Sequence, residues 1–420
     1  MRIDELTKRA EQGDSNAMVE LGVIYRWGDG AARDMEKCFY WTKKAAAMLN
    51  PIAYQYLGYH HEIPVGYSDL NDGNADYKSV FDCFFKGAVL DDANSMYKVG
   101  DMYFTGKFVE KDQGFAFRLY KRSEELSDYP SASLNLRLGE CYCMGLGTEQ
   151  DIVKAREHLE EAIDEYGDRE ANKDVPELYM EGFNRAKHLL KRIEADKIPG
   201  KPVDLAIENQ NKEYDAFVVG EQMNYPEPQY PIVALEALKI ENPVVPIPKG
   251  EDFNTVLAKA ESGDKWAMYY LAFFCADRFE KEPNSKDMID FALYYYYQAA
   301  QCGFSVALFT LGYVYLKGQG VVADPYKALK YFQQSNETIA LEEIGRYYLD
   351  GEVVEQNSEK AYKCFAKCAL FKEKYDYAAL PELARMYREG IFVEADVKFA
   401  DYLEEQGKKR GESGKKYEKG

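Results

Sequence analysis

The chain has 420 residues and 46% of them are hydrophobic, which is ample material for a folded core. Its formal net charge is −19 at pH 7 and its sequence pI is about 4.9. These values argue against the basic surface that a nucleic-acid-binding protein needs. We therefore expect a folded protein whose partners do not include nucleic acid.

The N-terminal residues, from Met1 to Leu6, carry charges where a secretory signal peptide needs an apolar core. No run of roughly 18 apolar residues, the length that a membrane-spanning helix requires, occurs in the sequence. The sequence thus predicts no membrane association and a cytoplasmic location.

Seven residues recur with the same spacing at three places along the chain. The first set is Leu21, Gly22, Tyr25, Gly28, Gly30, Asp34 and Lys37. The second set lies 117 positions later, from Leu138 to Lys154, and the third lies 290 positions later, from Leu311 to Lys327. Weaker copies surround Leu57, Val99, Leu271, Ile344 and Leu383. We count eight units, four on each side of a central interruption, a pattern typical of a solenoid.

Each unit begins with a predicted helix, which we name the A helix. In the first unit Ala17, Leu21 and Tyr25 are spaced four residues apart and so form one apolar stripe. Gly22 has no side chain, and we expect the backbone of another helix to approach it closely. An apolar stripe of this kind is buried only when a second helix packs against it.

A loop and a second predicted helix, the B helix, complete the unit. Gly28 is expected to end the A helix, because glycine adopts the left-handed conformation that helix C-termini favour. Asp34 is expected to cap the B helix, which opens with Lys37. Two antiparallel helices cannot bury both apolar stripes alone, so the units must stack on one another.

One pattern is shared by Ala17–Lys37 and Ala307–Lys327: A-x-x-x-L-G-x-x-Y-x-x-G-x-G-x-x-x-D-x-x-K. It resembles the Sel1-like repeat, a relative of the tetratricopeptide repeats, and the resemblance covers residues 1–165 and 253–405. The resemblance implies an all-α fold, an α–α superhelix of about eight helix-turn-helix repeats. It also implies a scaffold or adaptor that binds a protein or peptide in a concave groove lined by the A helices. A secreted branch of the family joins the helices of each unit by disulfides, but the eight cysteines here do not recur at one repeat position, so we expect reduced thiols.

The predicted domains follow in chain order. Residues 1–165 form four N-terminal units, and 251–405 form four C-terminal units. Residues 166–198 form an additional helical segment, and 406–420 a basic, flexible tail. The segment 199–250 holds eight of the fifteen prolines and no repeat motif. It is either a linker or a strap packed along the superhelix, and its aliphatic residues favour the strap.

Signals for catalysis are weak. Ser95 and Lys98 fit the S-x-x-K pattern of penicillin-interactive serine enzymes, but the companion motifs are absent and Ser95 occupies the small-residue position of Ala17. The pattern G-x-G-x-x-A that begins at Gly318 follows a predicted helix, whereas a dinucleotide-binding loop follows a strand. We therefore predict a protein that is not an enzyme and has no cofactor.

Signals for metal binding are equally weak. The sequence His60-His61-Glu62 lacks a ligand spacing that one helix face could use. The acidic segment Asp69–Asp76 resembles a calcium loop, but Val80 stands where the loop needs a bidentate glutamate. We predict no metal site. Two alternatives stay open: an enzyme with an unrecognised site in or near residues 197–250, and a structural subunit that self-associates.

The face of each A helix opposite its apolar stripe is the predicted partner site. Aromatic side chains alternate with charged ones there, a composition typical of interaction hot spots. The predicted residues are Tyr97, Asp101, Phe104, Tyr269, Phe273, Phe309, Tyr313, Arg346 and Arg385. The acidic surface favours a basic partner. The alternative is that these rings pack beneath the strap or between tightly wound units.

Overall fold

The computed structural model describes residues 2–62, 76–170, 177–195, 253–281, 286–335, 337–370 and 379–417. The predicted strap at 199–250 and most of the acidic segment near Asp69 lie outside these ranges. The chain divides into two compact units: unit 1 comprises Met1–Phe217 with Val397–Phe399, and unit 2 comprises Val218–Asp396 with Ala400–Gly420. Every helix or strand assigned in the described ranges is an α-helix, which confirms the predicted all-α fold.

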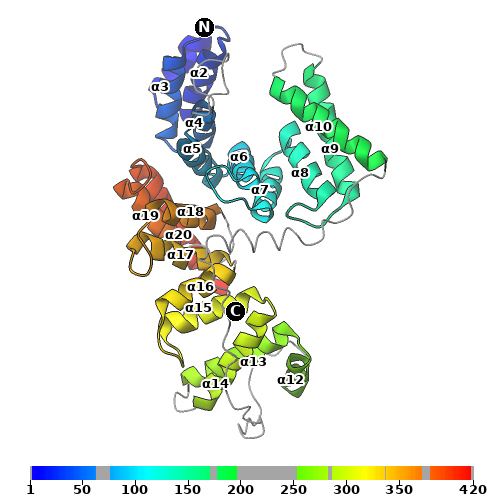
Figure 1. The fold of residues 1–420 in the computed structure, drawn as a ribbon. Helices are drawn as coiled ribbons and strands as arrows, with labels where there is room; N and C mark the ends of the chain where they lie inside the picture. The colour runs from blue at the N-terminus through cyan, green and yellow to red at the C-terminus, as the bar shows by residue number, and fades with distance from the viewer. Residues whose placement is uncertain are drawn as a thin grey trace. The chain divides into compact units, whose positions relative to one another are not determined.

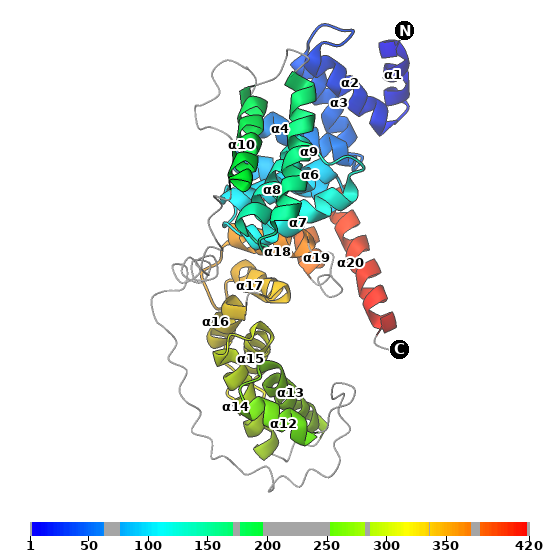
Figure 2. The same cartoon turned by 90° about the vertical axis from the view of Figure 1, so that its right-hand side faces the viewer.

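Unit 1 is a series of antiparallel helix pairs arranged in an arc, with the A helices on its inner side (Figure 1). A short first helix, α1, packs against α2 (Figure 2). The helices are α1 (Arg2–Glu11), α2 (Ser15–Trp27), α3 (Met35–Ala46), α4 (Pro51–Glu62), α5 (Tyr77–Val89), α6 (Ala93–Thr105), α7 (Gln113–Leu126), α8 (Ala132–Met144), α9 (Ile152–Glu170) and α10 (Glu177–Glu194). The A helices are α2, α4, α6 and α8, and each is followed by its B helix.

The additional helical segment predicted over residues 166–198 contains α10 (Glu177–Glu194). It packs against α8 and α9 and buries one side of itself. Its buried residues are Phe183, Ala186, Leu189 and Ile193. This helix therefore covers the last repeat of unit 1.

Unit 2 repeats the same plan, and its A helices are α13, α15, α17 and α19. Its helices are α12 (Phe253–Glu261), α13 (Lys265–Lys281), α14 (Lys286–Gln301), α15 (Ser305–Lys317), α16 (Pro325–Ser335), α17 (Thr338–Asp350), α18 (Ser358–Leu370), α19 (Ala379–Glu389) and α20 (Val397–Tyr417). Like α1 in unit 1, the short α12 packs against the first A helix of its unit. None of the described helices in either unit combines the length and apolar character that crossing a membrane requires.

The small residue of each A helix sets its distance from the B helix. A β-carbon on Gly312 would lie 2.5 Å from the ring of Phe332, and one on Gly100 would lie 2.7 Å from the ring of Tyr120. The expectation of a close approach is confirmed. At Gly22, where it was made, a β-carbon would lie 3.5 Å from the backbone carbonyl oxygen of Cys38, and the Thr42 side chain would lie closer still, at 2.7 Å.

The loop between the two helices explains the rest of the repeat motif. Gly318 ends α15 in the left-handed conformation, with φ of 69°. The backbone N–H of Asp324 donates to the carbonyl oxygen of Tyr315 at 2.9 Å, and the Asp324 carboxylate accepts from the backbone N–H of Lys327 at 3.0 Å. The Lys327 ammonium lies 4.0 Å from the centroid of the Tyr315 ring, a favourable cation–π contact. Tyrosine, glycine, aspartate and lysine thus recur together because they form one capping structure.

All eight cysteines are free thiols, as predicted, and five of them are buried. Cys141 illustrates the consequence of burial, which raises the pKa of its thiol to about 12. A thiol of this kind is a packing residue rather than a nucleophile.

Replacing Gly312 with leucine tests the close contact. The new side chain would overlap the Phe332 ring, and overpacking of this kind costs about 1–3 kcal/mol. Thermal unfolding should therefore show a lower midpoint. Gly167→Ala in α9 is the control, because a β-carbon there meets nothing within 4 Å and should slightly stabilise the helix. An unchanged midpoint for the Gly312 variant would contradict the contact.

Candidate protein-interaction surface on the A helices

The repeat register defines two positions on the exposed face of every A helix. We number each position from the small residue, glycine or alanine, that follows the leucine, valine or isoleucine recurring in each repeat. Position +1 directly follows the small residue, and position −2 precedes it by two. These small residues are Gly22, Gly58, Gly100, Gly139, Ala272, Gly312, Gly345 and Ala384. In several successive pairs, the side chain at +1 of one A helix contacts the side chain at −2 of the next.

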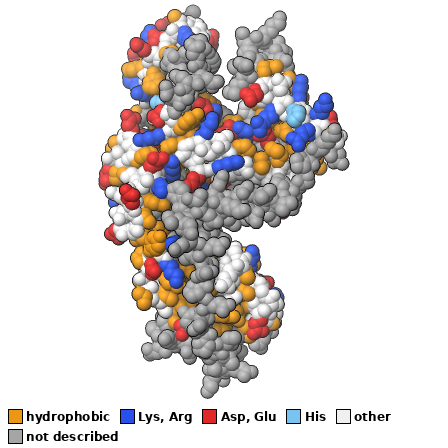
Figure 3. Space-filling view, viewed as in Figure 1, with side chains coloured by type: hydrophobic (Ala, Val, Ile, Leu, Met, Phe, Trp, Pro, Cys, Tyr) orange, Lys and Arg blue, Asp and Glu red, His pale blue; other side chains and the backbone are white. Residues whose placement is uncertain are grey.

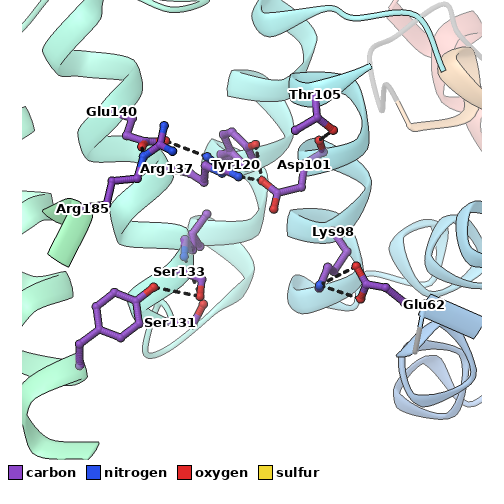
Figure 4. Close-up of polar contacts among 12 residues, drawn as sticks. Glu62, Lys98, Asp101, Thr105, Tyr120, Ser131, Ser133, Arg137, Glu140 and Arg185 are labelled. Carbon is purple, nitrogen blue, oxygen red and sulfur yellow. Dashed lines mark hydrogen bonds and ion pairs between the residues drawn. The ribbon is translucent and has the colours of Figure 1, made fainter. Parts of the chain in front are cut away.

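In unit 1 this contact first joins α4 to α6. The ammonium of Lys98, at −2 of α6, lies 5.0 Å from the ring centroid of Tyr59, at +1 of α4. The Glu62 carboxylate lies 2.9 Å from the same ammonium (Figure 4). Although burial opposes the charge, Glu62 raises the pKa of Lys98. Lys98 is therefore charged at neutral pH.

A second contact joins α6 to α8. The Asp101 carboxylate, at +1 of α6, accepts from Nε of Arg137, at −2 of α8, at 2.8 Å (Figure 4). The same oxygen accepts from the Tyr120 hydroxyl at 2.7 Å. The guanidinium carbon of Arg137 lies 4.9 Å from the centroid of the Phe104 ring. Tyr97 packs against Tyr120. Predicted residues Tyr97, Asp101 and Phe104 are thus brought together, but as a half-buried junction between repeats.

A third contact joins α8 to α10. Glu140, at +1 of α8, is fully buried and accepts from both Arg137 and Arg185 (Figure 4). Burial opposes the charge of Arg137, but Asp101 and Glu140 together raise its pKa. Removing one member would leave an uncompensated buried charge, which is strongly destabilising. This row of charges therefore holds adjacent repeats of unit 1 in register.

In unit 2 the same positions carry predicted site residues. The hydroxyl of Tyr313, at +1 of α15, donates to Glu343, at −2 of α17, at 3.0 Å. Arg346, at +1 of α17, lies 3.8 Å from Glu382, at −2 of α19. Arg385, at +1 of α19, lies 3.2 Å from Glu382 and its side chain is 44% exposed. The two arginines therefore share one acidic group.

A buried carboxylate lies beside this group. Glu342 contacts Arg346 at 2.5 Å, and its side chain is only 9% exposed. Burial, opposed in part by Arg346 and reinforced by Glu343 and Glu382, raises the pKa of Glu342 to about 7. The cluster contains three carboxyl groups and two guanidinium groups. Its net charge is therefore −1 at high pH, where all three carboxyl groups are ionised.

The aromatic residues of the predicted site differ in exposure. Phe309 and Tyr313 are half-buried, and both pack against the ring of Phe332. Tyr269 packs against Phe304 and Phe273. Phe273 is 49% exposed and is the most accessible ring of the predicted set. Truncation of Tyr313 should therefore lower stability, because its ring packs against Phe332 and its hydroxyl donates to Glu343.

Sequence reasoning missed several residues of this face. Lys98, Arg137 and Glu140 take part in its contacts, and Trp266 and Tyr270 are exposed on α13. Lys98, Arg137, Glu140 and Tyr270 share one signal, their place at −2 or +1 in the repeat register, and Trp266 lies four residues before −2. A comparison of those positions across the eight units would have found most of them.

The other candidate motifs have structural roles. Ser95 is fully buried, and a β-carbon on Gly87 would overlap its side chain, so its small size serves packing. His60 is buried between Arg26 and Cys38, and burial lowers its pKa to about 4. Among the described residues, no group of three or more His, Cys, Asp or Glu side chains could hold a metal ion.

The Glu342→Gln variant tests the buried carboxylate. The pKa of Glu342 is about 7 in the folded state, above its ordinary value of 4.5. The protonated carboxyl group therefore stabilises the folded wild type fully below pH 4.5, and this stabilisation is lost as the pH rises through 7. The glutamine of the variant does not ionise, so the variant loses no stability in this way. Its free energy of unfolding relative to wild type should therefore rise by about 2–3 kcal/mol between roughly pH 5 and pH 8.

Chemical denaturation at several pH values measures this difference. Glu355→Gln, at an exposed loop position of the same unit, is the matched control. A difference for the Glu342 variant that does not change with pH would show that this carboxylate ionises normally.

Comparison with known proteins places these helix pairs in a family. The model of the Sel1 repeat matches residues 15–48, 93–128, 132–165, 267–304, 305–337 and 338–369. The matches do not include the units around Leu57 and Leu383, which the sequence pattern also predicts. No curated protein matches the chain.

Two solved structures are similar to the chain at low identity. One is a protective antigen of uropathogenic Escherichia coli that displays an SLR fold, with 19% identity, 99% of this chain and 90% of that chain covered, and a TM-score of 0.32. The other is a Sel1 repeat protein from Oxalobacter formigenes, with 18% identity, 90% and 88% covered, and a TM-score of 0.32. The six matched repeats, whose helices and caps the structure contains, show that the chain belongs to the Sel1 repeat family.

Proposed function

We propose that the chain is a non-catalytic scaffold that binds another protein or peptide along the exposed face of its A helices. Proteins built from Sel1 repeats are generally scaffolds for protein interactions. The observation that supports a site on unit 2 is the row of Tyr269, Phe273, Tyr313 and Arg346 on three successive A helices. Phe273 is half exposed at one end of this row, and Arg346 is 38% exposed at the other.

The chemistry of the row suits a partner with both apolar and basic side chains. An aromatic side chain buries much apolar area at a low cost in side-chain entropy, so a few such residues carry most of the affinity of an interface. Above the Glu342 pKa of about 7, the carboxylates of Glu342, Glu343 and Glu382 outnumber the two guanidinium groups beside them, which favours an incoming lysine or arginine. Over the face that Figure 3 shows, charged side chains of both signs lie among hydrophobic ones.

The proposal also includes a cytoplasmic location and the absence of catalysis, both of which the sequence analysis predicts. A cytoplasmic location accords with the free thiols of the chain. A non-catalytic role accords with the burial of Ser95 and Cys141. The segment 197–250, the one place where the sequence left room for an enzyme site, lies outside the described residues. Affinity capture with the full chain and with a variant lacking 199–249 tests whether that segment holds the partner instead.

Phe273→Ala tests the row directly. Because this ring is half exposed, its loss should weaken binding of the captured and purified partner by about 1–2 kcal/mol while barely changing the unfolding midpoint. Isothermal titration calorimetry measures the affinity. Tyr129→Ala is the matched control, since that ring is 91% exposed in a loop of unit 1. Unchanged affinity for the Phe273 variant would place the partner elsewhere.

A further inference from the structure

The first A helices of the two units, α2 and α13, occupy equivalent places. Each follows a short helix, α1 or α12, that packs against it. A shift of 250 positions aligns them, so that buried Leu6 and Ala10 correspond to buried Val256 and Ala260. The two helices can therefore be compared position by position, which makes unit 1 an internal reference for unit 2.

In unit 1 the exposed face of the first A helix is polar over its first two turns. Asn16 accepts a hydrogen bond from Asn50 at 2.9 Å, and Glu20, at position −2, is exposed. A polar outer face is expected of a terminal repeat, because no further repeat covers it. An exposed ring, Trp27, occurs only at the C-terminal end of this helix.

In unit 2 the equivalent face is aromatic. Trp266 and Tyr270 replace Asn16 and Glu20, and Phe273 replaces Val23. Their exposed fractions are 52%, 36% and 49%. Spaced four and then three residues apart, the three rings form one stripe along the helix. Exposed aromatic rings gathered in one stripe are typical of an interaction site.

The later pairs of unit 2 show what packs beside such a face. Position −2 of α17 is contacted by Tyr313 of the preceding A helix, and position −2 of α19 by Arg346 of the preceding A helix. At α15, Thr310 lies 3.4 Å from the hydroxyl of Tyr269 on α13. Within the described part of unit 2, no A helix precedes α13, and its position −2 is the exposed Tyr270.

We propose that the Trp266–Tyr270–Phe273 stripe docks an α-helix of a protein partner through an apolar stripe on that helix. This inference rests on the proposed scaffold function and names the kind of partner. Position −2 contacts a helix in each later pair of unit 2, so the occupant continues an interface that the unit already contains. A stripe repeated every three to four residues also matches the side-chain spacing of a facing helix.

The size of the stripe indicates its strength. Three partly exposed rings bury far less than the roughly 800 Å² per partner of a stable complex. The helix therefore binds reversibly unless the partner also contacts the rest of the A-helix face. A second copy of the chain, held by the same rings, is the competing occupant.

The test transfers the polar face of unit 1 to unit 2. The probe is a designed, fluorescently labelled helical peptide with leucine at i, i+3, i+4 and i+7 and with Lys and Glu elsewhere. Fluorescence anisotropy compares its binding to the full chain and to the variant W266N/Y270E. We expect the wild type to bind and the variant to lose about tenfold or more in affinity. Y270E alone, a single change, should lose affinity in the same direction and guards against a folding defect in the double variant.

Three controls make the outcome decisive. Tyr40→Ala removes a ring that is 52% exposed on a B helix and should leave peptide affinity unchanged. Arg346→Ala, at the far end of the A-helix row, separates binding at this stripe from binding along the rest of the row. The same peptide with a central proline should not bind, because it cannot remain helical.

Each contrary result has a distinct meaning. Equal binding by wild type and W266N/Y270E, no binding by the wild type, or equal binding of the proline peptide would overturn the inference. If Arg346→Ala loses affinity for the peptide and W266N/Y270E does not, the stripe is not the docking site, and the proposed binding row along the A helices is supported instead. A wild-type mass twice that of W266N/Y270E in light scattering would identify a second copy as the occupant.

Discussion

The contact between a B-helix side chain and the glycine of its A helix, present in six of the eight repeats, is the constraint on which the other features of the repeats depend. At Gly345 a β-carbon would lie 2.5 Å from the ring of Phe365, as close as the equivalent contact at Gly312. Because the ring occupies the space of the missing side chain, neither helix can rotate or slide without a clash. The register of each pair is therefore set locally, and the outward positions on the A helix follow from it.

Stacking then converts that local register into a surface. Once the apolar stripes are buried between neighbouring pairs, positions +1 and −2 of successive A helices come within contact distance. In both units these positions carry charges on the last two A helices, and in unit 1 Asp101 pairs there with Arg137. The units differ most at the first A helix, where unit 1 has Glu20 and Val23 and unit 2 has Tyr270 and Phe273. The two units thus share one framework but present chemically different faces at their first A helix.

This difference bears on function more than the fold does. A fold of stacked repeats supports many roles, and specificity comes from the side chains that line its face. The paired charges of unit 1 satisfy one another, so they stabilise the stack. The exposed rings of α13 are not buried by the stack, and they remain available to a partner. For the described residues, unit 2 is therefore the better candidate for recognition.

The sequence by itself determined the repeat, its helices and its caps, because these depend on local spacing: Gly318 ends a helix and Asp324 caps the next within ten residues of chain. It also identified the outward face, since 3.6-residue periodicity separates Phe273 from the buried Leu271. Only the tertiary structure decided which of those outward residues pair across repeats. The contact of Asp101 with Arg137 and the burial of Glu342 depend on how neighbouring pairs stack, and no local pattern encodes that distance.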